Sequence, residues 1–515
     1  MNRVNRQTHT LSEYRDRLQQ ADLLVEAHIP DAAQPVEYLS YNSKDLGKNT
    51  LFVCKGAAFK EEYFRDVCRQ GILAYVSEVA YGETDPAIAS FLVRDIRKAM
   101  PIIADLYYNR AWEELNLIGI TGTKGKSTTA YYVKYILDAY LLAHRKNKSG
   151  IISSIDTYDG VIQEESHLTT PEAMDLHMHF RNAVNSQIEY MEMEVSSQAL
   201  KYNRVDGITF DVGIYLNISE DHISPLEHPD FEDYFAAKLK IFEHCRTAVV
   251  NMDADRWEDT RRAAQRASSL LTFSTQNPMA DILGYDIHKE GHDTIFKVKT
   301  KEFDRQFRLT MPGLFNVENA LASIGAAMAL GIPVEYMVEG LERARSSGRM
   351  EIYASKDNQV VAIVDYAHNK LSFEKLFSSV QQEYPGRDII SIFGCPGLKA
   401  LLRRKDLGTI AGRYSKKVYI VAEDPGLEPF MDISRDIAQY VEAQHCEYEI
   451  IEERGEAIRK AISQGRNAVL LITGKGNETR QKYGANYLPC ISDVEYTKKY
   501  LEEYNSRQKE WEPIY

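Results

Sequence analysis

The chain has 515 residues and a formal net charge of −13 at pH 7, with 44% hydrophobic and 27% charged residues. This length exceeds what a single hydrophobic core supports and predicts about three domains of roughly 100 to 200 residues each. The acidic balance argues against a general nucleic-acid-binding protein, which would need a basic excess.

No segment is predicted to cross a membrane, because no uncharged run approaches the roughly 20 residues that a spanning helix needs. The first twenty residues also lack the apolar core of a signal peptide. Six cysteines lie far apart without a CxxC pair, so neither a zinc knuckle nor a disulfide framework is indicated. We expect a reducing, cytoplasmic setting.

Short apolar runs alternate with longer helical stretches along the chain. The runs are predicted strands, at residues 51–54, 116–120, 212–218, 360–366, 388–394, 417–424 and 468–474. This alternation predicts an α/β fold with mostly parallel sheets covered by helices. We place domain boundaries near residues 113 and 345, before the strand NLIGI and after a charged helix that ends in LERARSS.

A glycine-rich loop, TGTKGKSTT at residues 121–129, joins the predicted strand NLIGI to a predicted helix. Backbone amides of such a loop and of the helix N-terminus attract an anion, Lys126 adds a positive charge, and the Ser127 hydroxyl can bind magnesium. The loop departs from GxxxxGK[ST], because Ile120 occupies the position of the first glycine and the other loop glycine is Gly122. The loop predicts a cradle for a nucleoside triphosphate; an ordinary glycine turn before a helix is the alternative.

The compressed form TGTxGK[ST] resembles the ATP site of the Mur ligases, which join amino acids to peptidoglycan precursors. Further segments resemble blocks of that family in the family's order, from about residue 38 to 490. They are LTTPEAMDLH (168–177), MEVSSQALKYNRV (193–205), LNISEDHI (216–223), HPDFEDYFAAKLKIF (228–242), GLFNVENALAS (313–323), GRMEIY (348–353), VDYAHN (364–369) and TGKGNE (473–478). The TTPE and EVSS blocks are most similar to those of the tripeptide synthetases, which add the third residue.

The resemblance implies a three-domain Mur ligase architecture with a central P-loop ATPase domain and a Rossmann-like C-terminal domain. It implies a UDP-sugar-binding domain over 1–113, an ATP-binding domain over 114–345 and an amino-acid-binding domain over 346–515. ATP and Mg²⁺ are the implied cofactors. The implied partners are a UDP-N-acetylmuramoyl dipeptide and a free L-amino acid, and we expect a monomer.

An amide ligase must convert an unreactive carboxylate into an acyl phosphate, a step that depends on positioning and charge neutralisation. The resemblance implies four catalytic residues, Lys126, Glu194, His222 and Lys238. Ser127, Glu194 and His222 would surround magnesium, although taken alone Glu194 is a surface carboxylate and His222 a loop histidine.

Lys238 lies on a predicted helix, where a lysine is usually solvated. The resemblance implies that it is carbamylated to N6-carboxylysine and so supplies an anionic oxygen ligand for a second magnesium, the ligand type that hard cations favour. Lys240 points about 200° away around the helix and is a poor substitute.

Substrate-binding residues follow from the same resemblance. The implied ATP-binding residues are Gly122, Thr123, Lys124, Gly125, Lys126, Ser127, Thr128, Asn316, Asn319, Arg349, Asp365 and His368. The implied UDP-substrate residues are Ser43, Thr169, Thr170, Ser196 and Arg204. The implied amino-acid-binding residues are Lys399, Glu423, Asp424, Pro425, Gly426, Gly474 and Glu478. Local structural roles remain open for some of them, such as a turn for Ser43 or a helix cap for Asp365.

Two segments depart from the diaminopimelate-adding members, and both lie where the incoming amino acid is expected. Their DNPR is replaced by residues 423–426, EDPG, and Lys399 stands where they carry an arginine. Because a carboxylate site normally uses the planar fork of arginine, Gly426 with Glu423, Asp424 and Glu428 nearby suits a lone cation better than a zwitterionic side chain. L-lysine is therefore the predicted amino acid. The alternatives are meso-diaminopimelate or ornithine, a folylpolyglutamate synthetase-like ligase, and a non-catalytic ATP-binding paralogue.

Overall fold

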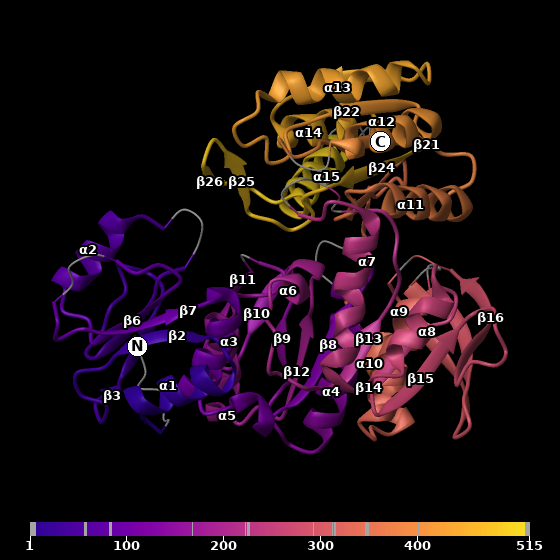
Figure 1. Cartoon of the computed structure of the whole chain (residues 1–515). Helices are drawn as coiled ribbons and strands as arrows, with labels where there is room; N and C mark the ends of the chain where they lie inside the picture. The colour runs from indigo at the N-terminus through magenta and orange to yellow at the C-terminus, as the bar shows by residue number, and fades with distance from the viewer. Residues whose placement is uncertain are drawn as a thin grey trace.

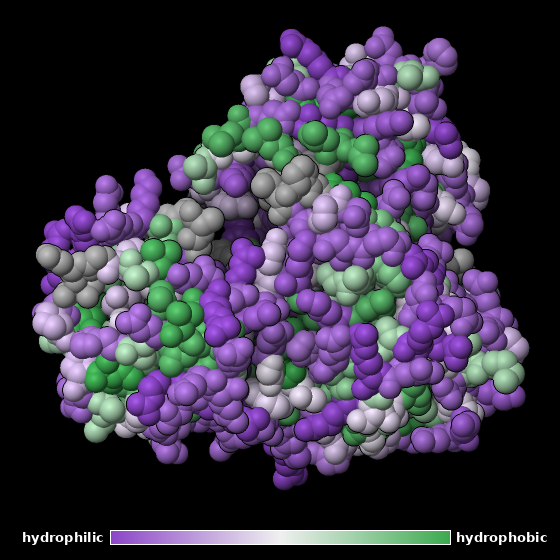
Figure 2. Space-filling view, viewed as in Figure 1, coloured by the Kyte–Doolittle hydropathy of each residue, from purple (hydrophilic) through white to green (hydrophobic). Residues whose placement is uncertain are grey.

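The structure is a computed structural model that describes residues 7–55, 59–81, 85–166, 168–221, 223, 227–291, 293–311, 313, 316–345, 350–398 and 401–509. In this part of the chain the strands form three large sheets that follow one another in sequence (Figure 1), together with two two-stranded pairs. No helix among these residues is long and apolar enough to span a membrane. Figure 2 shows a mostly hydrophilic face, with a hollow between the upper and left-hand regions of the molecule.

The first sheet has five strands in the order β2-β7-β6-β5-β4, all parallel except β2 against β7. Its strands are β2 (Leu24–His28), β4 (Tyr38–Ser40), β5 (Thr50–Val53), β6 (Ala74–Ser77) and β7 (Ala89–Val93). The helices of this region are α1 (Leu11–Gln20), α2 (Glu61–Arg69) and α3 (Ile96–Tyr107), and the short strands β1 (His9–Thr10) and β3 (Pro35–Val36) pair beside them.

The central sheet has eleven strands in the order β11-β10-β9-β12-β8-β13-β14-β15-β16-β17-β18. They are β8 (Asn116–Thr121), β9 (Gly150–Ile152), β10 (Asp156–Tyr158), β11 (Gln163–Glu165), β12 (Tyr190–Glu194), β13 (Phe210–Tyr215), β14 (Cys245–Asn251), β15 (Ser269–Ser274), β16 (Ile282–Glu290), β17 (Asp293–Lys299) and β18 (Asp304–Leu309). The middle of the sheet is parallel, and both edges are antiparallel.

Helices cover both faces of this central sheet. They are α4 (Lys126–Ala143), α5 (Ala173–Asn185), α6 (Ser197–Lys201), α7 (Phe231–Leu239), α8 (Trp257–Ala264), α9 (Asn316–Ala329) and α10 (Val334–Arg343), with 3₁₀ turns η1 (Ala111–Glu114) and η2 (Lys240–Glu243). Because successive strand residues point to opposite faces, Leu117 of β8 joins the core beneath α5, whereas Ile118 and Ile120 join the core beneath α4 and α9.

The C-terminal sheet has six strands in the order β19-β20-β24-β21-β22-β23, parallel except β19 against β20. They are β19 (Glu351–Ala354), β20 (Val360–Asp365), β21 (Asp388–Phe393), β22 (Lys417–Ile420), β23 (Glu447–Ile450) and β24 (Ala468–Thr473). The helices are α11 (Lys370–Glu383), α12 (Leu402–Tyr414), α13 (Phe430–Glu442), α14 (Arg454–Gln464) and α15 (Asp493–Lys509); β25 (Arg480–Tyr483) and β26 (Asn486–Pro489) form a hairpin.

All seven predicted strands are present, as β5, β8, β13, β20, β21, β22 and β24, and the predicted α/β class is confirmed. Two of the runs extend several residues beyond their strands, because β13 ends at Tyr215 and β22 at Ile420. The charged helix is shorter than predicted, because Ala344 has extended backbone angles and α10 ends at Arg343. All six cysteines are free thiols.

Candidate active site

The glycine-rich loop connects β8 to α4, at the carboxyl end of the parallel strands, where open α/β sheets bind their ligands. Gly125 has φ +87°, and a side chain there would place its Cβ 2.3 Å from Asn319 Oδ1. Asn319 in turn donates from Nδ2 to the Oδ1 of buried Asn316, 3.1 Å away. The loop is therefore in close contact with the start of α9, and Gly125 is required both for its backbone angle and for its lack of a side chain.

Three lysine side chains surround this loop. Lys126 Nζ donates to the Gly122 carbonyl at 3.0 Å, and Lys238 Nζ donates to the same carbonyl at 2.9 Å. Lys124 Nζ lies 3.6 Å from Asp221 Oδ2. The positive charges of Lys124 and Lys126 give the loop the electrostatic character that a polyphosphate requires.

Lys238 is buried within α7, in contrast to the solvated position that is usual for a helical lysine. Burial and the nearby charges of Lys126 and Lys124 hold the pKa of its amine well below the usual value. A neutral amine is the form that can react with carbon dioxide. Lys240 points elsewhere, with its Nζ 3.5 Å from the Leu200 carbonyl.

Oxygen donors gather beside the loop. Glu194 ends β12 and is buried, and its Oε1 accepts hydrogen bonds from the Ser154 amide at 2.8 Å and the Ser154 hydroxyl at 3.1 Å. The Ser127 and Ser154 hydroxyls are 3.0 Å apart. One carboxylate with two hydroxyls fits Mg²⁺, which prefers hard oxygen ligands. His222 lies outside the described residues, in which no group of three or more His, Cys, Asp or Glu side chains is placed to hold a metal.

A cavity of about 650 Å³ opens between the central and C-terminal sheets. Its lining unites two sets of predicted residues, Thr123 to Thr128 with Thr169 and Glu194 from the central region, and His368, Glu423, Asp424, Gly426, Gly474 and Glu478 from the C-terminal region. A smaller cavity of about 90 Å³ adjoins the other side of the loop and is lined by Asn319 and Asp365. Arg349 and Lys399 lie outside the described residues.

Asp365 ends β20, and His368 belongs to the turn that follows the strand. Asp365 Oδ2 accepts from the Met350 amide at 2.9 Å and Oδ1 from the Ala367 amide at 2.7 Å, so its carboxylate fixes this turn. His368 Nδ1 donates to the Tyr366 carbonyl at 2.8 Å. Desolvation, with Lys124 and Arg403 nearby, holds the pKa of the His368 ring well below its usual value.

Glu423 follows β22 and is a buried carboxylate whose Oε2 has no hydrogen-bond partner among the described residues. Burial raises its pKa to about 7, with Asp424 adding to the rise and Arg454 opposing it. Gly474 lies against it, because a Cβ at Gly474 would be 2.0 Å from Glu423 Oε2. Glu423 is thus a carboxylate at the cavity wall that lacks a neutralising contact at one oxygen.

The other acidic groups at this end of the cavity are already paired. Lys475 Nζ lies 2.5 Å from Glu478 Oε2 and 3.1 Å from Asp424 Oδ1. The Tyr366 hydroxyl donates to Glu478 Oε1 at 2.5 Å. The backbone after Asp424 turns sharply, since Gly426 has φ +60° and its amide donates to the Lys482 carbonyl. The Pro425 carbonyl would lie only 1.9 Å from a Cβ at Gly397, so the two loops are in direct contact.

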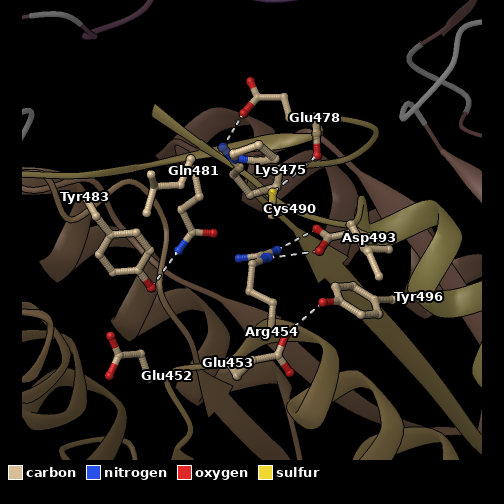
Figure 3. Close-up of a pocket in the computed structure, with 13 residues that line it drawn as sticks. Glu452, Glu453, Arg454, Lys475, Glu478, Gln481, Tyr483, Cys490, Asp493 and Tyr496 are labelled. Atoms are coloured by element: carbon tan, nitrogen blue, oxygen red, sulfur yellow. Dashed lines mark hydrogen bonds and ion pairs between the residues drawn. The ribbon is translucent and has the colours of Figure 1, made fainter. Parts of the chain in front are cut away.

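Sequence reasoning missed several residues that support this site. Asp221 joins the central and C-terminal regions, because its Oδ1 lies 2.9 Å from Arg403 NH2 and its Oδ2 accepts from Asn369 Nδ2. Arg454 and Asp493 form a buried bidentate ion pair behind the loops that carry Glu423 and Gly474. Arg454 Nε donates to Asp493 Oδ1 at 2.9 Å, and Arg454 NH2 donates to Asp493 Oδ2 at 2.5 Å (Figure 3). The only sequence signal for Asp221 was its place in the acidic pair before His222. No sequence pattern marked Arg454 as a residue that supports the site.

Arg454 supports the ends of two strands. Its guanidinium donates to the Thr473 carbonyl at 2.8 Å and to the Ala422 carbonyl at 3.3 Å. These carbonyls immediately precede Gly474 and Glu423. The ion pair of Arg454 and Asp493 lines a cavity of about 200 Å³, which Lys475 and Glu478 also line.

Three of the predicted UDP-substrate residues, Thr170, Ser196 and Arg204, form one hydrogen-bonded group beside Glu194. The Thr170 hydroxyl donates to the Glu194 carbonyl at 2.9 Å and accepts from the Ser196 amide at 3.0 Å. Ser196 caps α6, since its hydroxyl accepts from the Ala199 amide. Arg204 donates to the Thr170 carbonyl at 3.0 Å and lines a separate cavity of about 120 Å³.

Two cations and one carboxylate accompany Arg204 at that cavity. Glu172 lies between Arg204 NH2, at 2.7 Å, and Lys55 Nζ, at 2.6 Å, and Arg97 completes the cationic lining. The excess of positive charge suits an anionic ligand. Ser43 is not among the residues that line these four cavities; its carbonyl accepts from Gln70 Nε2 at 3.4 Å.

Comparison with known proteins identifies two matching domain families, the Mur ligase middle domain over residues 120–327 and the Mur ligase glutamate ligase domain over residues 348–476. A UDP-N-acetylmuramoyl-L-alanyl-D-glutamate–L-lysine ligase of Streptococcus agalactiae is 36% identical over 468 residues, 90% of this chain and 92% of that protein. The enzyme of the same name from Enterococcus faecalis is 34% identical over 97% of this chain and 100% of its own length.

Solved structures share the fold. A UDP-N-acetylmuramoyl-L-alanyl-D-glutamate–2,6-diaminopimelate ligase superposes with a TM-score of 0.65 at 21% identity, over 96% of this chain and 99% of that one. A MurF ligase from Thermotoga maritima, solved in complex with ADP, has a TM-score of 0.60 at 17% identity, over 92% of this chain and 99% of its own. The matched domains, the extent of the identity and the shared fold confirm the resemblance found in the sequence: this chain belongs to the Mur ligase family.

Proposed function

We propose that this protein is an ATP-dependent tripeptide synthetase that adds L-lysine to UDP-N-acetylmuramoyl-L-alanyl-D-glutamate in peptidoglycan precursor synthesis. The observation that carries the proposal is the cavity of about 650 Å³. The glycine-rich loop lines one part of this cavity, and an acidic wall formed by Glu423, Asp424 and Glu478 lines another. The proposal assigns 1–113 to the UDP-sugar, 114–345 to ATP and 346–515 to the amino acid, and the protein would act as a cytoplasmic monomer.

In this proposal the loop and its lysines hold the triphosphate, and Lys126 neutralises the phosphoryl group as it moves to the D-glutamate side-chain carboxylate. Mg²⁺ bound by Ser127, Glu194 and His222 would supply further charge neutralisation. The amine of lysine then attacks the acyl phosphate, releasing phosphate as the amide bond forms. Stabilising developing charge with preorganised groups is the principal means by which such sites accelerate phosphoryl transfer.

Lys238 would act as a carbamate. Its low pKa and burial favour the neutral amine, whose nitrogen forms a bond to the carbon of carbon dioxide as one proton leaves. The product is an anionic oxygen donor beside the Gly122 carbonyl, suited to a second magnesium. The position of Lys238 against the loop supports this role and gives none to Lys240.

The acidic wall supports lysine as the amino acid. Asp424 and Glu478 are paired with Lys475, which leaves Glu423 as the buried carboxylate with an oxygen lacking a hydrogen-bond partner among the described residues. A terminal ammonium would satisfy that oxygen, whereas the extra carboxylate of meso-diaminopimelate would be repelled by it. Gly426 supplies no cation to offset that repulsion.

The test is to incubate the protein with ATP, the UDP-dipeptide and a mixed amino-acid pool, and to determine the molecular mass of the product. We expect the mass of a lysyl tripeptide and a kcat/KM for L-lysine at least about 10²-fold above that for meso-diaminopimelate, because a site that pairs a polar group rejects analogues that leave it unpaired. A preference for meso-diaminopimelate would refute the lysine assignment and keep the ligase. No ADP release with any amine would refute the ligase.

A further inference from the structure

The edge strand β11 of the central sheet contacts the start of the β25–β26 hairpin, which lies above it in Figure 1. The Thr479 hydroxyl donates to Glu165 Oε2 at 2.6 Å, and Arg480 NH2 donates to the Ser166 carbonyl at 2.6 Å. Arg480 Nε lies 3.8 Å from Glu165 Oε1. A hydrogen bond from a hydroxyl to an ionised carboxylate at an oxygen-to-oxygen distance of 2.6 Å is charge-assisted and stronger than one between neutral groups.

Both partners of this contact adjoin segments assigned to substrates. Thr479 directly follows Glu478, which Lys475 and the Tyr366 hydroxyl fix within the C-terminal region. Glu165 lies a few residues before Thr170, which is fixed within the central region by the Glu194 carbonyl. The contact therefore joins the segment that carries Glu478 to the segment that carries Thr170, although Glu165 and Thr479 are 314 residues apart in sequence.

We propose that Glu165 is a positioning residue that, together with the contacts of Asp221, sets the distance between the activated carboxylate and the incoming amine. This inference rests on the proposed function. Amide formation requires the amine and the acyl phosphate to approach closely, and a displacement of about 1 Å in such a pair can cost about 10²-fold in rate. The contacts of Glu478 with Lys475 and Tyr366 cannot set this distance, because they lie within the C-terminal region.

The test compares Glu165→Ala, Thr479→Val and the double variant with Glu164→Ala, an exposed neighbour on the same strand that serves as the matched control. Tripeptide synthesis gives kcat and KM for L-lysine, and equilibrium titration in the absence of the other substrates gives the Kd for ATP. We expect Glu165→Ala to lower kcat/KM for lysine by about 10-fold to 100-fold, while its Kd for ATP and all constants of Glu164→Ala stay within about twofold of the wild type.

The double variant distinguishes a direct contact from two separate effects. If Glu165 and Thr479 act through their shared hydrogen bond, the double variant loses no more than Glu165→Ala alone, because residues in contact are not additive. Losses that multiply, an equal loss in ATP affinity, or a Glu165→Ala variant that matches Glu164→Ala would each overturn the proposal. A wild-type protein that forms no tripeptide would instead overturn the proposed function.

Discussion

Glu423→Gln is expected to make the protein more stable at neutral pH and less able to bind lysine. Glu423 is buried, its Oε2 lacks a hydrogen-bond partner among the described residues, and its pKa is raised from 4.5 to about 7. A rise of this size corresponds to about 3 kcal/mol of unfavourable free energy when the carboxylate is ionised in the native state. Glutamine has nearly the same shape and carries no charge, so it removes this cost.

The sign of the pH dependence follows from proton binding. Below about pH 4.5 both the native and the unfolded states hold the Glu423 proton, so the substitution changes little. Between about pH 4.5 and pH 7 the unfolded state loses the proton first, and the free energy of unfolding of the wild type falls as pH rises. Glu423→Gln is therefore expected to match the wild type near pH 4 and to exceed it by about 3 kcal/mol near pH 8.

Urea denaturation from about pH 4 to pH 8 measures this difference, with Glu442→Gln, an exposed position on α13, as the control. Lysine binding gives the second measurement. An ammonium pairs with ionised Glu423, so lysine affinity of the wild type should increase as pH rises through about 7, and Glu423→Gln should bind weakly without that increase. A stability difference that does not grow with pH would refute the reasoning.

Lys126→Ala should lower kcat by about 10²-fold to 10³-fold through loss of transition-state charge stabilisation, and near-normal ADP release would remove Lys126 from the phosphate site. Lys238→Ala should be nearly inactive and partly restored by a short carboxylic acid, whereas Lys240→Ala should be mild; equal losses of tripeptide synthesis at the two positions would contradict the carbamate. Arg454→Met should lower the free energy of unfolding by about 3 to 5 kcal/mol, because it leaves the buried Asp493 carboxylate without its partner; urea denaturation with an unchanged midpoint would contradict this.

Some strands could be predicted from the sequence because a strand that is buried on both faces consists mostly of apolar residues. β8, β20 and β24 are covered on both faces and consist of unbroken apolar runs, so each was predicted. The strand β16, between β15 and β17 near one end of the central sheet, was missed, since its sequence ILGYDIHKE mixes polar side chains into one exposed face. The antiparallel edges of the central sheet were consequently absent from the prediction.

The same distinction applies to the site. The glycine loop and Glu194 were predicted because each is marked by short motifs at the end of a strand. Asp221 and Arg403 meet over 182 residues of chain, and a charged side chain that will form an ion pair across two domains has the same local sequence as one that will face water. Lys238 was found by resemblance alone, and its burial is visible only in the structure.

The pairing of β12 with β8 has a consequence for how this family can vary. Glu194 is in parallel register with Ile120, and the Val195 amide donates to the Ile120 carbonyl at 2.8 Å. The separation between the Glu194 carboxylate and the glycine-rich loop is therefore set by the hydrogen bonds between β12 and β8. It is not set by the length of the chain that connects the two strands. Insertions and deletions in the loops of that connecting chain that contact neither group can occur without moving them, whereas a shift of one residue in the ladder would turn Glu194 to the opposite face of the sheet.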